Sequence, residues 1–143
     1  MKRLFFVGCL GLLSLACSFT AEQIPLTPTP DIPSVQFQFP NNNAQVFEGT
    51  DLSIELLASD NTQGIARIEL YVDALTDSEP YQTASPVAAE AVPVFTARMN
   101  WLAQGIGRHQ FTAVAFRPDG FQSDEVTIVV EVIPREDVAT ASP

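Results

Sequence analysis

Apolar and polar residues alternate in several short segments of this chain, and this period of two limits the fold more than any other feature. In one segment Leu52, Ile54, Leu56 and Ala58 alternate with more polar neighbours. A period of two is typical of a β-strand with one buried face. Turn-forming residues rich in Pro, Asn, Asp and Gly separate the segments. The segments that show the pattern are 35–39, 52–58, 66–72, 95–101, 109–116 and 126–132.

No stretch between these segments has a convincing helical period. The run 87–92 is short and lies between prolines, which disfavours a helix. A short strand is expected at 81–83. Short strands with regular turn signals predict an all-β fold, a β-sandwich of about seven antiparallel strands with Greek-key connections. We place this domain at residues 34–134, and closure of the sheet into a barrel is the alternative architecture.

The segment from Gly107 to Gly120 is predicted to be the central strand, because apolar residues occur on both of its sides. Phe111 and Ala113 share one side with His109, whereas Val114 and Phe116 lie on the other. Both faces of such a strand are covered at least in part. We therefore interpret His109, the only histidine, as a structural residue at the rim of the core.

The first 16 residues have the features of a secretory signal peptide. Lys2 and Arg3 precede an apolar core of 13 residues, Leu4–Ala16. This core is too short to cross a bilayer of about 30 Å as a helix, although a retained membrane anchor is the alternative. The chain is therefore expected to be exported.

The end of this segment, Leu13-Ser14-Leu15-Ala16-Cys17, resembles the lipobox of bacterial lipoproteins. Ser14 departs from the leucine usual at its position. The resemblance implies cleavage before Cys17, lipidation of its thiol with acyl chains such as palmitate, and a membrane as partner. It places the protein in the cell membrane or outer envelope, facing outside the cytoplasm. Cys9 would leave with the signal, so the mature chain would contain no disulfide.

The regions beside the predicted domain differ from it in composition. Residues 17–33 contain four prolines, with Thr-Pro-Thr-Pro in the middle, which favours an extended tether of about 3.1 Å per residue. Residues 135–143 are predicted to form a polar tail. The net charge of −10, from 17 acidic and 7 basic residues, argues against nucleic acid as a partner.

Residue types that carry chemistry are sparse. A single histidine and no further cysteine after Cys17 make a catalytic triad or a transition-metal site improbable. Two loose acidic groups, around Asp73 and around Asp119, lack the spacing of a calcium loop. We predict no enzyme activity, no cofactor and no metal. Trp101 is interpreted as a core or rim residue, with a carbohydrate-stacking platform as the alternative.

The segment from Ser34 to Ile133 resembles the bacterial Ig-like domains of exported and cell-surface proteins. Three pieces carry the resemblance, namely 46–54, 65–73 and Trp101 followed by 107–116. Arg117 stands where that family tends to have aspartate. The resemblance implies an Ig-like sandwich and no particular chemistry, since such modules serve as spacers, adhesive units and ligand binders.

If the sheet pairs as in Ig domains, Tyr71, Val114, Phe116 and Val129 share its outer face. A large exposed apolar patch there would indicate a partner-binding face for a protein or glycan. Ordinary exposed apolar residues, or cover from the 73–93 segment, are the alternatives. The sequence thus predicts a non-catalytic, lipid-anchored envelope module for binding or scaffolding at the cell surface. The alternatives are an accessory subunit of an envelope complex, or a carbohydrate-binding or adhesive module.

Overall fold

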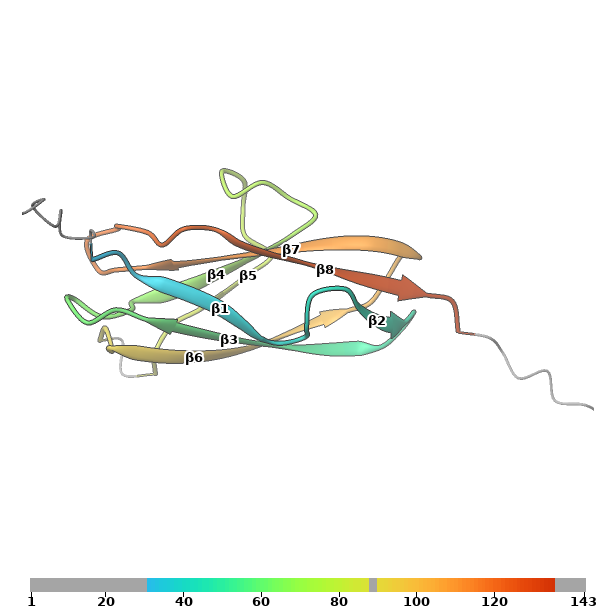
Figure 1. Cartoon of the computed structure of the whole chain (residues 1–143), viewed down its shortest axis with the longest axis horizontal. Helices are drawn as coiled ribbons and strands as arrows, with labels where there is room; N and C mark the ends of the chain where they lie inside the picture. The colour runs from blue at the N-terminus through green and yellow to red at the C-terminus, as the bar shows by residue number, and fades with distance from the viewer. Residues whose placement is uncertain (1–30, 88–89, 136–143) are drawn as a thin grey trace, which may run out of the picture.

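The computed structural model describes residues 31–87 and 90–135 and shows two β-sheets packed face to face (Figure 1). All regular elements in these ranges are strands. They are β1 (Ser34–Phe39), β2 (Ala44–Phe47), β3 (Asp51–Ser59), β4 (Arg67–Val72), β5 (Gln82–Ala84), β6 (Val94–Leu102), β7 (Gly107–Phe116) and β8 (Val126–Ile133). The predicted all-β sandwich is confirmed.

The strands form a three-stranded sheet, in the order β1-β3-β6, and a five-stranded sheet, in the order β2-β8-β7-β4-β5. The chain crosses between the sheets after β1, β2, β3, β5 and β6, so neighbours in sequence are often not neighbours in a sheet. β7 pairs with β4 on one side and with β8 on the other. The segment predicted to be the central strand therefore lies in the middle of the larger sheet.

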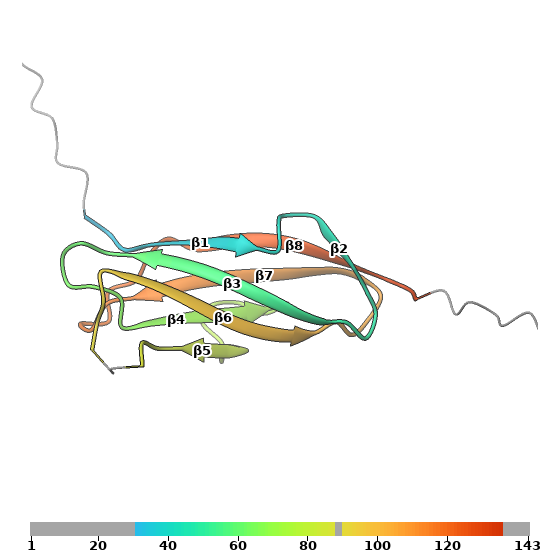
Figure 2. The same cartoon turned by 90° about the horizontal axis from the view of Figure 1, so that it is seen from below.

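The core lies between the inner faces of the two sheets, which Figure 2 shows from the side. Alternate residues of each long strand point into it, because successive side chains of a strand point to opposite faces. Phe111 of β7 is fully buried, and its ring meets the Trp101 ring edge-on with 5.0 Å between centroids. Other core residues from the two sheets are Val35, Leu52, Ile54, Leu56, Ala58, Ile68, Leu70, Ala97, Met99, Ala113, Ala115, Ile128, Val130 and Val132.

Two details differ from a uniformly antiparallel sandwich. β2 pairs with β8 in parallel, from Ala44 opposite Val130 to Phe47 opposite Ile133. The sequence around β2 shows only a short apolar stretch before a glycine turn, so the sequence pattern does not indicate a strand there. In β1 the register shifts between Phe37 and Phe39, and Phe39 is exposed rather than part of the inner face.

The described chain enters the sandwich at one end and leaves it at the other (Figure 1). Ser34 pairs with Ser59 at the entry end, whereas Ile133 pairs with Phe47 at the exit end. We call these the tether end and the distal end. The predicted signal peptide, Cys17, most of the tether and most of the polar tail lie outside the described residues.

Candidate functional site

The four residues of the predicted partner-binding face share the outer face of the larger sheet, but they do not form an exposed apolar patch. Tyr71 is 3% exposed and Val114 is 1% exposed. Phe116 and Val129 are half-buried. The exposure on which that prediction depended is therefore missing at two of the four positions, and a partner-binding role for them stays a prediction.

A polar network on β4 accounts for this burial. Glu69 accepts hydrogen bonds from Arg67 Nε and from the Tyr71 hydroxyl, both at 2.7 Å. The Arg67 guanidinium lies 3.8 Å from the centroid of the Phe116 ring, within the range of a cation–π contact. Val114 is opposite Glu69 in the β4–β7 register, in the middle of these long side chains. Burial, together with the hydrogen bond to Glu69, raises the pKa of Tyr71 to about 12.

His109 occupies the distal end of the same sheet and joins two loops. Its Nδ1 lies 2.6 Å from Asp73 Oδ2, and its Nε2 lies 2.6 Å from the Gly105 carbonyl oxygen. Both partners are acceptors, so both ring nitrogens donate only when the ring is protonated. Burial lowers the pKa of His109, but the two acceptors outweigh it and the pKa is raised overall. The structural interpretation of His109 agrees with these contacts.

Trp101 packs beside His109, with 5.1 Å between ring centroids, and it is buried. A stacking platform for carbohydrate needs an exposed ring face, so the structure favours the core interpretation of this tryptophan. The edge-on contact with Phe111 places it in the main core. Trp101 thus supports the strand end that carries His109.

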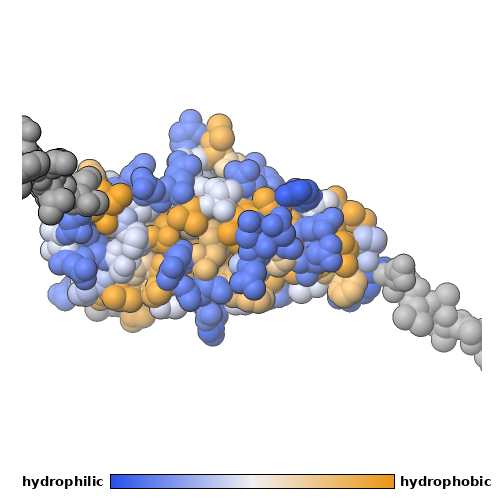
Figure 3. All heavy atoms as spheres, in the orientation of Figure 1, coloured by the Kyte–Doolittle hydropathy of each residue, from blue (hydrophilic) through white to orange (hydrophobic). Residues whose placement is uncertain are grey.

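The loop after β4, residues 73–81, projects over the outer face of the larger sheet (Figure 1). Asp73 has a φ of 51° and accepts a hydrogen bond from the Gln110 backbone N–H; aspartate tolerates this left-handed conformation better than most residues. Further along, the Thr76 hydroxyl bonds to Glu125. We call this segment the Asp73 loop. In Figure 3 the projecting loop carries hydrophobic as well as hydrophilic residues.

An open groove of about 490 Å³ lies beside the Asp73 loop. A smaller hollow of about 260 Å³ lies on the loop's other flank, toward Glu125. The larger groove faces the distal end of the sheet and brings together charged, polar and apolar side chains. Its lining residues are Asp73, Ala74, Leu75, Arg108, His109, Gln110 and Val129.

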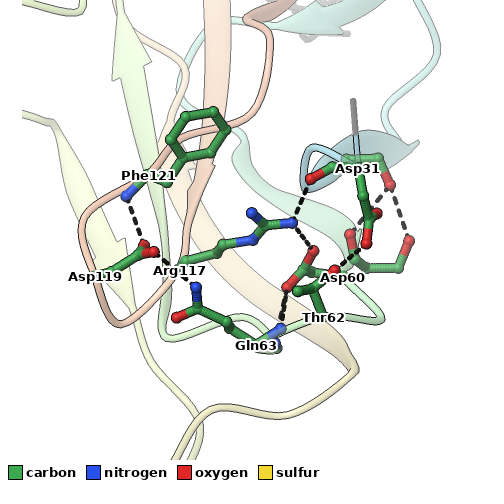
Figure 4. Close-up of polar contacts among 10 residues, drawn as sticks. Asp31, Asp60, Thr62, Gln63, Arg117, Asp119 and Phe121 are labelled. Carbon is green, nitrogen blue, oxygen red and sulfur yellow. Dashed lines mark hydrogen bonds and ion pairs between the residues drawn. The ribbon is translucent and has the colours of Figure 1, made fainter. Parts of the chain in front are cut away.

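The tether end contains a buried ion pair that the sequence does not predict (Figure 4). Asp60 is 3% exposed and accepts a hydrogen bond of 2.5 Å from Arg117. Asp60 also accepts the backbone N–H groups of Gln63 and Gly64, both at 2.8 Å. The Arg117 hydrogen bond, with these two backbone bonds, lowers the pKa of Asp60 to about 2, against the opposing effect of burial.

Arg117 links this pair to the entering chain. One of its terminal nitrogens donates to the Asp31 carbonyl oxygen at 2.6 Å. Asp119, in the turn after β7, accepts from the Gln63 side chain at 2.8 Å. Three segments distant in sequence thus meet at Arg117. Its Nε atom is buried without a hydrogen-bond partner among residues 31–87 and 90–135.

Residues 59–64 are a polar segment rich in turn-forming residues, and their polarity gives no indication that Asp60 is buried. The local signal was present, because Asp60 precedes Gln63 and Gly64 by three and four residues, the spacing of a side-chain cap on backbone N–H groups. Arg117 stood out only as a departure from the family pattern. Nothing local in the sequence joins the two residues.

The remaining site predictions concern metal ions, membrane spans and Cys17. Within the part of the chain that the structure describes, no three His, Cys, Asp or Glu side chains are placed to hold a metal ion. Over the same residues, no helix has the length and apolar character needed to cross a bilayer. Cys17, the predicted lipidation site, precedes the first described residue.

Comparison with known proteins identifies first the class and then the family of the domain. One similar solved structure is that of fibronectin(III)-like modules of Clostridium thermocellum CbhA, with 22% identity and a TM-score of 0.56, covering 71% of this chain and 98% of that one. A second is the sialic acid binding region of a Streptococcus sanguinis SK1 adhesin, with 14% identity and a TM-score of 0.53, covering 75% of this chain and 31% of that one. A third is an endo-beta-1,4-mannanase from Thermotoga petrophila, with 9% identity and a TM-score of 0.51, covering 76% of this chain and 21% of that one. At these identities the likeness is one of fold, an Ig-like β-sandwich.

A family model described as bacterial Ig domain matches residues 33–113, more than half of the chain. The chain therefore belongs to the bacterial Ig domain family. No curated protein matches the sequence. The resemblance on which the sequence analysis relied is thus confirmed for the domain, and the family itself specifies no reaction.

Proposed function

We propose that this chain is a non-catalytic, lipid-anchored module of the bacterial cell envelope, in which the Ig domain binds or scaffolds other components outside the cytoplasm. The observation that carries the proposal is the N-terminal sequence, in which a short apolar segment ends in Leu-Ala-Cys at Cys17. A proline-rich stretch and then a bacterial Ig domain follow it. Membership of this family supports binding or scaffolding rather than catalysis.

The geometry of the tether end supports the same arrangement. Arg117 holds the Asp31 carbonyl group, and Pro33 is buried, so the last residues before β1 are fastened to the domain. With an extended rise of about 3.1 Å per residue, the predicted tether would hold this end within roughly 50 Å of the lipid surface. The distal end, with the Asp73 loop and its groove nearby, would then face away from the membrane.

Metabolic labelling with radioactive palmitate tests the anchor. The full-length chain should incorporate label and sediment with membranes, whereas Cys17→Ala should do neither, because its side chain offers no thiol for acylation. The chain provides a matched control in Cys9→Ala, which removes the other cysteine from the same apolar segment. That variant should be labelled like the unmodified protein.

Two results would contradict the anchor at Cys17. One is equal labelling of Cys17→Ala and the unmodified chain. The other is loss of label in Cys9→Ala with retention in Cys17→Ala, which would move the site to Cys9. Crosslinking in the native envelope, followed by identification of the partners, separates an accessory subunit from a free-standing binding module.

A further inference from the structure

The groove beside the Asp73 loop is large enough for a small ligand. Its volume of about 490 Å³ lies within the range of about 300–1,000 Å³ usual for small-molecule sites. One wall is the outer face of the larger sheet, from Arg108 to Gln110 on β7 and Val129 on β8. The other is the loop, whose Leu75 is 75% exposed. The groove therefore combines apolar side chains, such as Leu75 and Val129, with charged and polar ones, such as Arg108.

Arg108 differs from the other arginines of the strands and their turns. Arg67, Arg98 and Arg117 each have a carboxylate within 4 Å. Arg108 lines the groove, is exposed, and has no such partner in the described ranges. In a chain with 17 acidic and 7 basic residues, this is an unexpected place for a guanidinium without a carboxylate.

The strand register places Glu131 opposite Arg108, but the Glu131 carboxylate bonds to another residue. Glu131 of β8 lies directly opposite Arg108, where cross-strand pairs of opposite charge normally attract each other. Its Oε2 instead accepts a hydrogen bond of 2.7 Å from Gln45 Nε2 on β2. Gln45 thus holds the neighbouring carboxylate on the side of Glu131 away from β7, and the guanidinium remains available to the groove.

The neighbouring charges leave Arg108 as the group that selects a ligand. His109 and Asp73 also line the groove, but they bond to each other at 2.6 Å, and the second ring nitrogen of His109 bonds to Gly105. Their charges offset each other when the histidine is protonated. A planar guanidinium with free N–H groups matches a carboxylate in a bidentate manner.

We propose that this groove binds a small carboxylate-bearing ligand, with Arg108 pairing with the carboxylate while Leu75 and Val129 contact its apolar part. The proposal deepens the binding role given above and does not depend on the lipid anchor. A failed palmitate experiment would remove the anchor and leave the groove unaffected. Two sources of such a carboxylate, a sugar acid and an acidic amino-acid derivative, share this chemistry.

Amide chemical shifts of the full-length chain, isotope-labelled and purified in nonionic detergent, provide the test. The probes are glucuronate and N-acetylglutamate, each with an uncharged counterpart that lacks every carboxylate, namely glucose and N-acetylglutaminamide. At least one acid should shift the resonances of groove residues such as Leu75, Gln110 and Val129, and its neutral counterpart should not. The acid that acts shows which source of carboxylate fits.

Arg108→Gln should weaken binding of that acid at least about tenfold, because a charge-assisted pair is lost. Arg98→Gln is the matched control, since Arg98 is exposed on the other sheet and pairs with Glu55; it should bind like the unmodified chain. Absence of groove shifts with both acids, equal shifts with a neutral probe, or unchanged binding by Arg108→Gln would overturn the proposal.

Glu131→Gln tests the role of the displaced neighbour. It removes the carboxylate nearest to Arg108 in the register while leaving an amide that still bonds to Gln45. Binding of the acid should be equal or tighter, because a competing negative charge is gone. A tenfold loss would show that Glu131 rather than Arg108 organises the groove, and would overturn the assignment.

Discussion

The two ends of β7 use similar groups for different purposes. Just after its C-terminal end, Arg117 pairs with Asp60, whose side chain is buried, and holds the entering chain at Asp31. Near its N-terminal end, His109 pairs with Asp73 beside an open groove. Both pairs join a strand to a loop from elsewhere in the sequence. They differ in burial and in the pKa of the base.

Because of this difference, the Arg117–Asp60 pair should be insensitive to pH near neutrality, whereas the His109–Asp73 pair should depend on it. An arginine keeps its charge at all physiological pH values, and a buried carboxylate beside it has no competing solvent. Histidine loses its charge near neutral pH, and Asp73 is exposed. We therefore expect the tether end to hold its geometry over the whole neutral range. The distal end should respond to pH.

The largest expected effect follows from breaking the tether-end pair. Arg117→Met should lower the free energy of unfolding by about 3–5 kcal/mol, because it leaves the Asp60 carboxylate buried without its partner. Urea denaturation, followed by the fluorescence of Trp101, the only tryptophan, measures this loss. Arg98→Met is the matched control, and loss of its exposed pair with Glu55 should cost at most about 1 kcal/mol. Equal losses in the two variants would contradict the structural role.

A smaller effect is expected in acid. The pKa of Asp60 is about 2 in the folded protein and about 3.9 in an unfolded chain. Its contribution is therefore present above about pH 4 and is lost as the pH falls through the folded pKa. The loss should reach about 2 kcal/mol. The difference in stability between the unmodified chain and Asp60→Asn, measured by urea denaturation from about pH 5 to pH 2, isolates this residue, and a constant difference would refute the assignment.

The smallest effect concerns His109. Its raised folded pKa means that its contribution is fully present below the unfolded pKa of about 6.5 and is lost as the pH rises through the folded value. The loss should be at most about 1 kcal/mol, as for a single hydrogen bond. Unfolding of the unmodified chain and of His109→Gln between about pH 5 and pH 9 measures it. The variant should lack this pH dependence, and a parallel profile would show that the histidine is not its source.

The sandwich was predictable because burial within a strand depends on local alternation. Leu52, Ile54, Leu56 and Ala58 are all buried, as their spacing indicates. The same rule identified the inner residues of β4, β6 and β8. It did not reveal β2, whose strand character comes from pairing with β8, more than 80 residues later in the chain.

The functional surfaces were less predictable, because they depend on which side chains meet across the fold. Asp60 and Arg117 are 57 residues apart, and no local pattern relates them. The apolar side chains of the predicted face were correctly placed on the outer side, but Tyr71 and Val114 are buried there. Arg67, Glu69 and Tyr71 alternate along β4, so a network among them was open to inference from the sequence. Their cover over Val114 depends on the register with β7.

The entry and exit of the described chain at opposite ends have a mechanical consequence. A force applied between these ends would act along the strands, since β1 and β8 run lengthwise between them (Figure 1). β2 and β8 pair in parallel over four residue pairs, so their hydrogen bonds lie across the line of force. They would be sheared together rather than opened one after another. Under such a force, the resistance of the domain would be concentrated where β2 pairs with β8.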